Sequence, residues 1–296
     1  MFAKLADILG MIKFSHTLFA LPFALLGAAL AANGPGGRTA RLQDWFGIVL
    51  CMATARSAAM AFNRLADWRI DALNPRTATR HLPAGRLSSG SVAAFTVACC
   101  VLFVASTALF LPNPWPSRLS VPILAWLLGY SFAKRFTSLA HFWLGAALML
   151  APIAAWIALR GSLDWPPALL GLAVLAWVAG FDVIYACQDA AFDRGVGLHS
   201  LPARIGIGPA LRLAAACHAA MVVALVALGL SYPLGRLYFA GVAVVAALLV
   251  YEHTLVRPDD LTRVNRAFFQ VNVGISVGLL AVGLLDLWWG ASASIP

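Results

Sequence analysis

Long apolar segments separated by short polar ones dominate the pattern along this 296-residue chain. A transmembrane helix needs about 20 predominantly apolar residues, and nine segments approach or reach that length. Apolar residues run continuously within them instead of alternating, which favours helices over barrel strands. The pattern predicts an all-α integral membrane protein, with nine transmembrane helices in one bundle and a single domain over residues 1–296. The expected spans are residues 15–32, 44–63, 91–111, 119–133, 138–159, 168–187, 209–230, 235–256 and 267–289.

Composition supports the membrane assignment and excludes an ordinary soluble domain. Hydrophobic residues make up 61% of the chain and charged residues only 11%, whereas a soluble domain is about a quarter charged. The formal net charge of +9 would suit nucleic acid, but membrane topology accounts for its distribution. With the N-terminus placed in the cytoplasm, fifteen Lys and Arg residues lie inside and five outside, and Arg56 within a span completes the 21. The positive-inside rule therefore predicts a multi-pass protein with a cytoplasmic N-terminus and an outside C-terminus.

Polar residues at helical spacing follow the second expected span. Asn63, Asp67 and Asp71 stand four residues apart. Each such step rotates an α-helix by only about 40°, so on a continuing helix all three share one face. Arg56 lies seven residues before Asn63 and therefore deeper on the same face. This segment predicts a polar helix face that emerges from the membrane on the cytoplasmic side.

A second polar face follows the sixth expected span, and it resembles the first. Its members fall within a narrow sector of a regular helix, and both sets contain two aspartates four residues apart. Each set is followed by a related segment, HLPAG at 81–85 or HSLPA at 199–203. The repeat suggests an internal duplication with two half-sites facing each other. The second set is Asp182, Tyr185, Asp189 and Asp193.

Carboxylates at these spacings repel one another unless a cation lies between them. Hard oxygen ligands with room for water and phosphate are what Mg²⁺ prefers, and nearby basic residues suit phosphate oxygens. We therefore predict a Mg²⁺-dependent diphosphate site that opens toward the cytoplasm. The alternative is a solvated loop with ordinary salt bridges, but two matched registers disfavour it. The predicted metal ligands are Asp67, Asp71, Asp189 and Asp193.

The two motifs resemble those of the UbiA superfamily of intramembrane prenyltransferases. The first is Asn-x-x-x-Asp-x-x-x-Asp followed by RTATRHLPAG, and the second is Tyr-x-x-x-Asp-x-x-x-Asp followed by GLHSLPARIG. The nine expected spans fit as well, so the resemblance covers essentially the whole chain. IKFSHTLFALPFALLGA at 12–28 and AKRFT at 133–137 are similar to the 4-hydroxybenzoate polyprenyltransferase branch. The second motif departs from the DRDDD and GIKST of ubiquinone enzymes and looks more like relatives that make menaquinone.

The resemblance implies an enzyme that transfers a polyprenyl group from polyprenyl diphosphate to an aromatic carboxylic acid in respiratory quinone biosynthesis. The expected acceptor is 4-hydroxybenzoate, and 1,4-dihydroxy-6-naphthoate is the alternative. Mg²⁺ on the four aspartates would assist diphosphate ionisation, at the cytoplasmic face of the inner membrane, beside cap loops after spans two, four and six. Arg56 matches a family arginine that holds the acceptor carboxylate. The other expected substrate-binding residues are Asn63, Tyr185, Asp182 and, for diphosphate, Arg76, Lys134, Arg135 and Arg204.

Three alternatives stay open from the sequence. Arg56 could instead form a structural pair with Asp67 or Asp182, and the basic residues could reflect topology alone. A secondary transporter would also show repeats and intramembrane charges. Clustering of the acids at one membrane face, in metal-type pairs, favours the enzyme. Oligomeric state and prenyl chain length cannot be read from the pattern.

Overall fold

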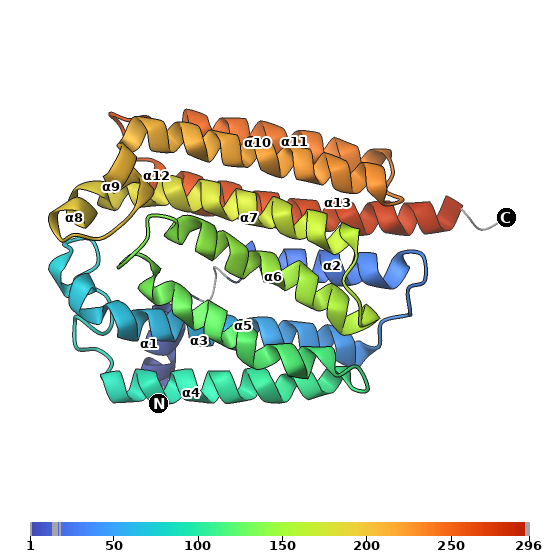
Figure 1. Ribbon diagram of the computed structural model, residues 1–296, viewed down its shortest axis with the longest axis horizontal. Coiled ribbons are helices and arrows are strands. Elements are labelled where there is room, and N and C mark those ends of the chain that lie inside the picture. The colour runs from blue at the N-terminus through green and yellow to red at the C-terminus, as the bar shows by residue number, and fades with distance from the viewer. Residues whose placement is uncertain (1, 14–16, 18, 294–296) are drawn as a thin grey trace. The chain divides into compact units, whose positions relative to one another are not determined.

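The computed structural model describes residues 2–13, 17 and 19–293, and this part of the chain is helical with no strand (Figure 1). Its nearest approach to sheet structure is one antiparallel bridge between Arg257 and Asp260. The chain divides into two compact units. Unit 1 consists of Met1–Thr17 and Gln43–Ala133, and unit 2 consists of Leu18–Leu42 and Lys134–Pro296.

Seven helical segments among the described residues are long and apolar enough to cross a membrane. This confirms the all-helical membrane class, but the expected count of nine spans is not confirmed. The helix at Leu21–Asn33 has 13 residues, which extend only about 20 Å, and residues 15, 16 and 18 of that expected span lie outside the described residues. The helix at Trp115–Ala133 is not among the seven. The seven are Leu42–Leu73, Ser89–Phe110, Ala140–Arg160, Trp165–Gly195, Ile207–Ser231, Arg236–Thr254 and Ala267–Trp289.

Unit 1 is built around α3, a single helix of 32 residues. It ends before Asn74 because the following Pro75 disfavours helical geometry in the residue before it. The next long helix begins where the Ser88 side chain caps it by accepting a hydrogen bond from the Ser91 amide at 3.2 Å. The helices of unit 1 are α1 (Phe2–Met11), α3 (Leu42–Leu73), α4 (Ser89–Ser106), η2 (Thr107–Phe110) and α5 (Trp115–Ala133).

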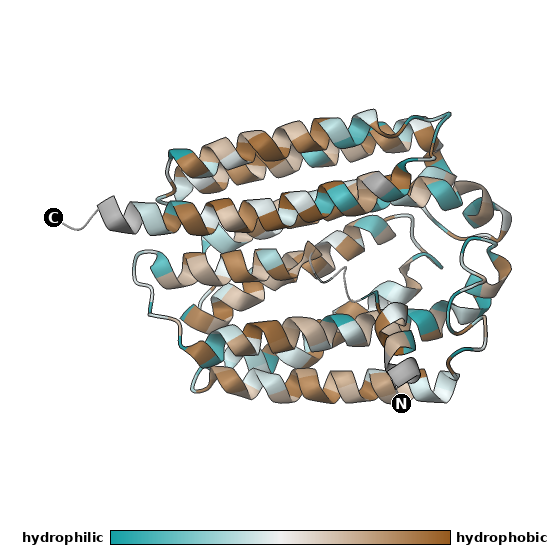
Figure 2. Cartoon of the chain, turned by 180° about the vertical axis from the view of Figure 1, so that it is seen from behind, coloured by the Kyte–Doolittle hydropathy of each residue, from teal (hydrophilic) through white to brown (hydrophobic). Residues whose placement is uncertain are grey.

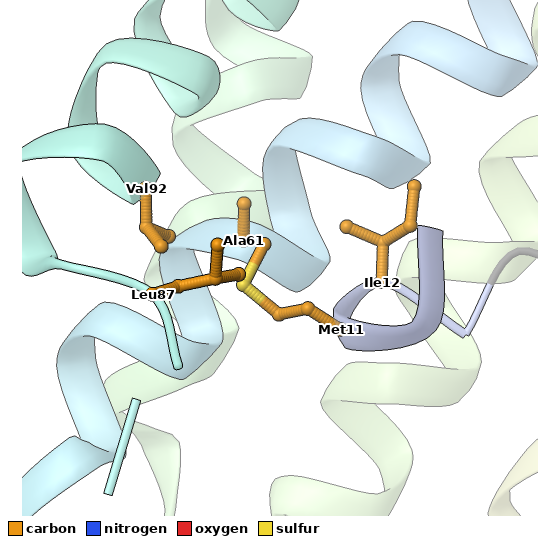
Figure 3. Close-up of a cluster of buried hydrophobic side chains, with 5 residues drawn as sticks. All are labelled: Met11, Ile12, Ala61, Leu87 and Val92. Atoms are coloured by element: carbon orange, nitrogen blue, oxygen red, sulfur yellow. The ribbon is translucent and has the colours of Figure 1, made fainter. Parts of the chain in front are cut away.

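The short helix α1 was not expected from the sequence, and a buried apolar cluster anchors it. Met11 and Ile12 at its end pack with Ala61 of α3 and with Leu87 and Val92 at the start of α4 (Figure 3). All five side chains are buried, so the cluster fastens α1 to the part of α3 that precedes the first acidic motif.

Unit 2 is built around α7, which packs against α6 on one side and α10 on the other (Figure 1). A Cβ on Gly145 of α6 would lie 2.5 Å from the Leu175 carbonyl oxygen, so only glycine permits this approach. The helices of unit 2 are α2 (Leu21–Asn33), α6 (Ala140–Arg160), α7 (Trp165–Ala186), η3 (Cys187–Asp189), α8 (Ala190–Gly195), α9 (Leu201–Ile205), α10 (Ile207–Ser231), α11 (Arg236–Thr254), α12 (Val264–Arg266), η4 (Ala267–Val271) and α13 (Asn272–Ala293).

Large apolar side chains remain exposed on the helices of both units. Leu42, Trp165 and Leu230 are each more than three-quarters exposed, at 86%, 80% and 78%. Figure 2 shows apolar colour along most of the helices, with hydrophilic residues mainly in the connecting segments and at helix ends. Lipid can cover such surfaces at no hydration cost, whereas water would penalise them. The exposure therefore agrees with an integral membrane protein.

Candidate active site

The first acidic motif lies on α3, which continues without interruption from the apolar span to Leu73. The expected continuous helix is therefore present, and Asn63, Asp67 and Asp71 occupy successive turns of it. The Asn63 Nδ2 donates a hydrogen bond to the Asp67 Oδ2 at 3.0 Å, as residues four apart on one face should allow. Helical spacing was thus sufficient to predict the local geometry of this half-site.

Two arginines that the sequence analysis did not select hold Asp71. The Arg64 Nη1 lies 3.3 Å from the Asp71 Oδ2, and the Arg80 Nη1 lies 2.6 Å from the Oδ1. Asp71 and Arg64 are buried. Arg64 precedes Asp71 by seven residues, only about 20° away around the helix, so its position could have been predicted. Arg80 comes from the connection after the helix, and periodicity does not place it.

Positive charge exceeds negative charge around Asp71. Partial desolvation, together with Arg64, Arg80 and Arg76, lowers the pKa of Lys13. Mutual repulsion among these cations is the cost of gathering them around one carboxylate. Such a surplus suits an additional anion, and a diphosphate would be one. Arg76 was among the predicted diphosphate ligands; its side chain is exposed, and its backbone amide donates to the Asn74 Oδ1 at 3.0 Å.

Arg56 lies on α3 within a candidate membrane span, about two turns before Asn63. Its Nε is shielded from solvent and has no hydrogen-bond partner among the residues that the structure describes. Asp182, the alternative partner named from the sequence, bonds to His141 within unit 2. A guanidinium group at membrane depth is costly and marks a functional site by default.

The second acidic motif departs from the single regular helix that its spacing suggested. Helix α7 ends at Ala186, and a 3-10 turn covers Cys187–Asp189 before α8 begins. A 3-10 turn has about 3.0 residues per turn instead of 3.6. Regular helical spacing therefore relates Asp182 to Tyr185 but does not place Asp189 and Asp193 on the same face. The Tyr185 ring lies against Phe268, with 4.4 Å between ring centroids.

Asp193 is buried and lacks the close cations that surround Asp71. The Lys134 Nζ lies 4.0 Å from its Oδ2, which is too long for a hydrogen bond. Within the described residues this buried oxygen has no hydrogen-bond partner. Asp189 is also buried. An uncompensated carboxylate oxygen of this kind fits a hard divalent cation such as Mg²⁺.

The connection after the second motif folds back on the segment between α5 and α6. The His199 amide donates to the Lys134 carbonyl at 2.7 Å, and the Arg204 Nη1 donates to the Ser138 Oγ at 3.1 Å. Lys134 and Arg204 are thereby held in one region of unit 2. Arg135 follows Lys134 and is exposed. Three of the four predicted diphosphate-binding residues thus belong to connected segments of the same unit.

His141 is a further residue that sequence reasoning missed. It is fully buried on α6, and its Nδ1 lies 2.7 Å from the Asp182 Oδ2. Its Nε2 accepts a hydrogen bond from the Leu201 amide at 3.3 Å. Nothing in the spacing of the motif indicates this partner, because it lies 41 residues before Asp182 on another helix.

Within each unit, no group of three or more His, Cys, Asp or Glu among the described residues could hold a metal ion. Unit 1 contains Asp67 and Asp71, and unit 2 contains Asp189 and Asp193. Each unit thus contributes one pair of the predicted ligands. The oxygen donors and the unpartnered Asp193 Oδ2 fit the chemistry of Mg²⁺.

The fold and these helix ends define a helical membrane protein with two pairs of aspartates at the ends of apolar helices. The chain belongs to the UbiA prenyltransferase family, whose model matches residues 20–274. A protein of Vibrio campbellii named 4-hydroxybenzoate octaprenyltransferase is 31% identical over 243 residues, covering 81% of this chain and 83% of that protein. The family match excludes the transporter alternative and confirms the predicted class of enzyme, a prenyltransferase.

Solved structures share the fold. The apo structure of a UbiA homologue from Aeropyrum pernix K1 superposes with a TM-score of 0.82 at 34% identity, covering 92% of this chain and 98% of that one. A UbiA homologue from Archaeoglobus fulgidus, bound to DMAPP and Mg²⁺, gives a TM-score of 0.71 at 19% identity, covering 95% and 99%. The second likeness supports the fold alone.

Proposed function

We propose that this protein transfers a polyprenyl group from a polyprenyl diphosphate to 4-hydroxybenzoate in respiratory quinone biosynthesis, at the inner membrane. The observation that carries the proposal is Arg56. Its guanidinium lies in a candidate membrane span with Nε shielded and unpartnered among the described residues. A planar guanidinium matches a carboxylate through paired hydrogen bonds, and an aromatic acid supplies that carboxylate on an otherwise apolar ring. The relatives named 4-hydroxybenzoate octaprenyltransferase support the same acceptor.

We further propose that the two units form one catalytic domain. A four-carboxylate site requires both, because each unit contains one aspartate pair. The nine-span arrangement, with cap loops after the second, fourth and sixth spans, would bring both pairs to the cytoplasmic face. The excess of Lys and Arg in the expected inside segments supports a cytoplasmic N-terminus and an outside C-terminus.

Asp67, Asp71, Asp189 and Asp193 would hold Mg²⁺, which would supply positive charge to the diphosphate leaving group. Cationic side chains of the protein would add to this positive charge: Arg64 and Arg80 near the first aspartate pair, and Lys134 near the second.

Other polar and aromatic residues would position the substrates. Asn63 holds the Asp67 carboxylate by a hydrogen bond. Tyr185 and its neighbour Phe268 are aromatic rings of the kind that stabilises an allylic cation. Arg76, Arg135 and Arg204 would bind further diphosphate oxygens. Lipid and apolar helices exclude the water that would intercept the cation.

The reaction that these residues support breaks the allylic C–O bond, and the electron pair leaves with diphosphate. A ring carbon ortho to the phenol oxygen of the acceptor then forms the new C–C bond. The acceptor loses one proton in exchange for the prenyl group. The same chemistry applies to 1,4-dihydroxy-6-naphthoate, which also carries a carboxylate. Supplying both acids to purified protein with one polyprenyl diphosphate separates the two acceptors.

Arg56→Ala tests the proposal. We expect the KM for 4-hydroxybenzoate to rise about 10- to 100-fold, because a charge-assisted pair contributes about 1.5–3 kcal/mol, with little change in the KM for polyprenyl diphosphate. Arg118→Ala provides the matched control, since Arg118 is exposed over Trp115 at one end of α5. Equal changes in both KM values for Arg56→Ala would refute carboxylate binding by Arg56.

A further inference from the structure

Asp182 and the buried His141 form a pair that the diphosphate chemistry above does not use. Asp182 lies in α7, about two helical turns before Asp189 and therefore on the membrane side of the second acidic motif. His141 is completely buried, whereas the Asp182 side chain retains 15% exposure. The aspartate is thus the member of the pair that another molecule can reach.

The hydrogen bonds of His141 determine its tautomer. A backbone amide can only donate, so the Nε2 that receives the Leu201 N–H must be unprotonated. The proton of the neutral ring is therefore on Nδ1, where it donates to the Asp182 Oδ2 at 2.7 Å. The two ring nitrogens of His141 are thus both engaged, Nδ1 by Asp182 and Nε2 by the Leu201 amide.

Only one oxygen of Asp182 is engaged by this contact. The Oδ1 accepts no hydrogen bond from the residues that the structure describes, and it is absent from the buried atoms that lack a partner. The pair therefore has the arrangement of an oriented general base. The Asp182 Oδ2 is fixed by His141, and the Asp182 Oδ1 can accept a proton. A candidate general base needs such an oxygen within reach of the proton that it removes.

We propose that Asp182 is the general base that removes the phenol proton of the acceptor, and that His141 is its positioning residue. This inference rests on the proposed function. The O–H proton moves to the Asp182 Oδ1, and the phenolate ring carbon bonds to the allylic carbon as the C–O bond breaks and its electrons leave with diphosphate. The resulting dienone shifts its ring proton to oxygen, which restores the aromatic phenol. One proton remains on Asp182 and is released.

Placement along α7 supports this role. Asp189 and Asp193 belong to the predicted metal site, whereas Asp182 lies about 10 Å deeper along the helix. In the proposed function the aromatic acid binds deeper in the membrane than the diphosphate. A base for the phenol must therefore lie deeper than the metal ligands, and Asp182 is the acidic residue of α7 that does.

Asp182→Asn is the sharpest variant, because its carbonyl can still accept the His141 proton while the base is lost. We expect kcat with 4-hydroxybenzoate to fall by about 10²- to 10⁴-fold and the KM values to change little. With 3-fluoro-4-hydroxybenzoate, whose phenol is more acidic, the ratio of wild-type to variant kcat should shrink by about tenfold or more. A structural defect would affect both acceptors equally, and that result would overturn the proposal.

Two His141 variants test the positioning role. His141→Phe removes the hydrogen bond to Asp182, whereas His141→Asn keeps an amide N–H that can replace it. We expect the asparagine variant to retain more kcat than the phenylalanine variant, and both to show the same acceptor dependence as Asp182→Asn. If Asp182→Asn fails to fold, kcat of these two variants with 4-hydroxybenzoate and with 3-fluoro-4-hydroxybenzoate provides the same test. A wild-type protein that prenylates neither phenol would instead overturn the proposed function, and the base with it.

Discussion

The two acidic helix ends have the same Asp-x-x-x-Asp spacing but opposite electrostatic surroundings. In unit 1, Asp71 is bracketed by Arg64 and Arg80 at 3.3 and 2.6 Å, so both its oxygens are engaged. In unit 2, the nearest cation to Asp193 is the Lys134 Nζ at 4.0 Å among the contacts of the described residues, and its Oδ2 has no hydrogen bond there. One carboxylate has two close guanidinium partners, whereas the other has a single, more distant ammonium partner.

This difference indicates a division of roles within the proposed site. A carboxylate held by two guanidinium groups organises cations that can bind diphosphate oxygens. A buried carboxylate without a hydrogen bond gains most from a divalent cation. We therefore expect Asp193 to contribute chiefly to metal affinity and Asp71 chiefly to the arrangement of the arginines. Spacing alone would assign them the same role.

The largest effect should come from Asp193→Asn. We expect kcat to fall by about 10³-fold, because loss of a metal ligand removes charge stabilisation of the leaving group. The thermal stabilisation that Mg²⁺ gives the wild type should disappear as well. Without Mg²⁺, however, the variant should melt no lower than the wild type, since the substitution relieves a buried carboxylate whose Oδ2 has no hydrogen bond among the described residues. Melting curves in detergent with Mg²⁺ or with a chelator measure both effects, and an unchanged response to Mg²⁺ would refute the metal role.

Asp71→Asn should have the next largest effect, and chiefly on stability. The substitution leaves the buried Arg64 without its carboxylate, and breaking such a pair costs about 3–5 kcal/mol. We expect a lower free energy of unfolding with or without Mg²⁺, in contrast to Asp193→Asn. Adding Arg64→Met should recover part of the loss, because the unpaired buried charge is then removed. If the Asp71 variant melts like the wild type, the two carboxylates do not differ as the structure indicates.

Much of this comparison could be predicted from the sequence, and the remainder could not for identifiable reasons. Hydrophobic length predicted several of the helices to within a few residues, for example 168–187 against α7 at Trp165–Ala186. Helical spacing placed Asp67 and Asp71 correctly, because α3 is regular throughout. It failed after Ala186, where the 3-10 turn changes the rotation per residue. Spacing within one helix also carries no information on partners from other segments, such as Arg80 and His141.

Connections are the least predictable part of both half-sites. Helix α1 is too short for a transmembrane pattern, yet it packs against α3 and the start of α4 through Met11 and Ile12. The Lys134–Asp193 contact depends on a fold-back held by the His199 amide. These arrangements result from packing between segments distant in sequence, so periodicity does not reveal them. The two motifs could be found from the sequence, but their charge balance depends on the structure.

The smallest predicted effect concerns His81 in the connection after α3. Its Nε2 lies 3.7 Å from the Asp7 Oδ1 of α1, and burial, Arg86 and Arg64 lower its pKa, while Asp7 opposes the shift. Because the folded pKa is below the unfolded one, the unfolded chain binds a proton first as pH falls through its unperturbed value near 6.5. Folding should therefore weaken modestly below that pH, with a change in melting temperature on the order of 1 °C. His81→Gln should lose this component between pH 7.5 and 5.5, and a variant with the same pH profile as the wild type would show that His81 does not contribute to it.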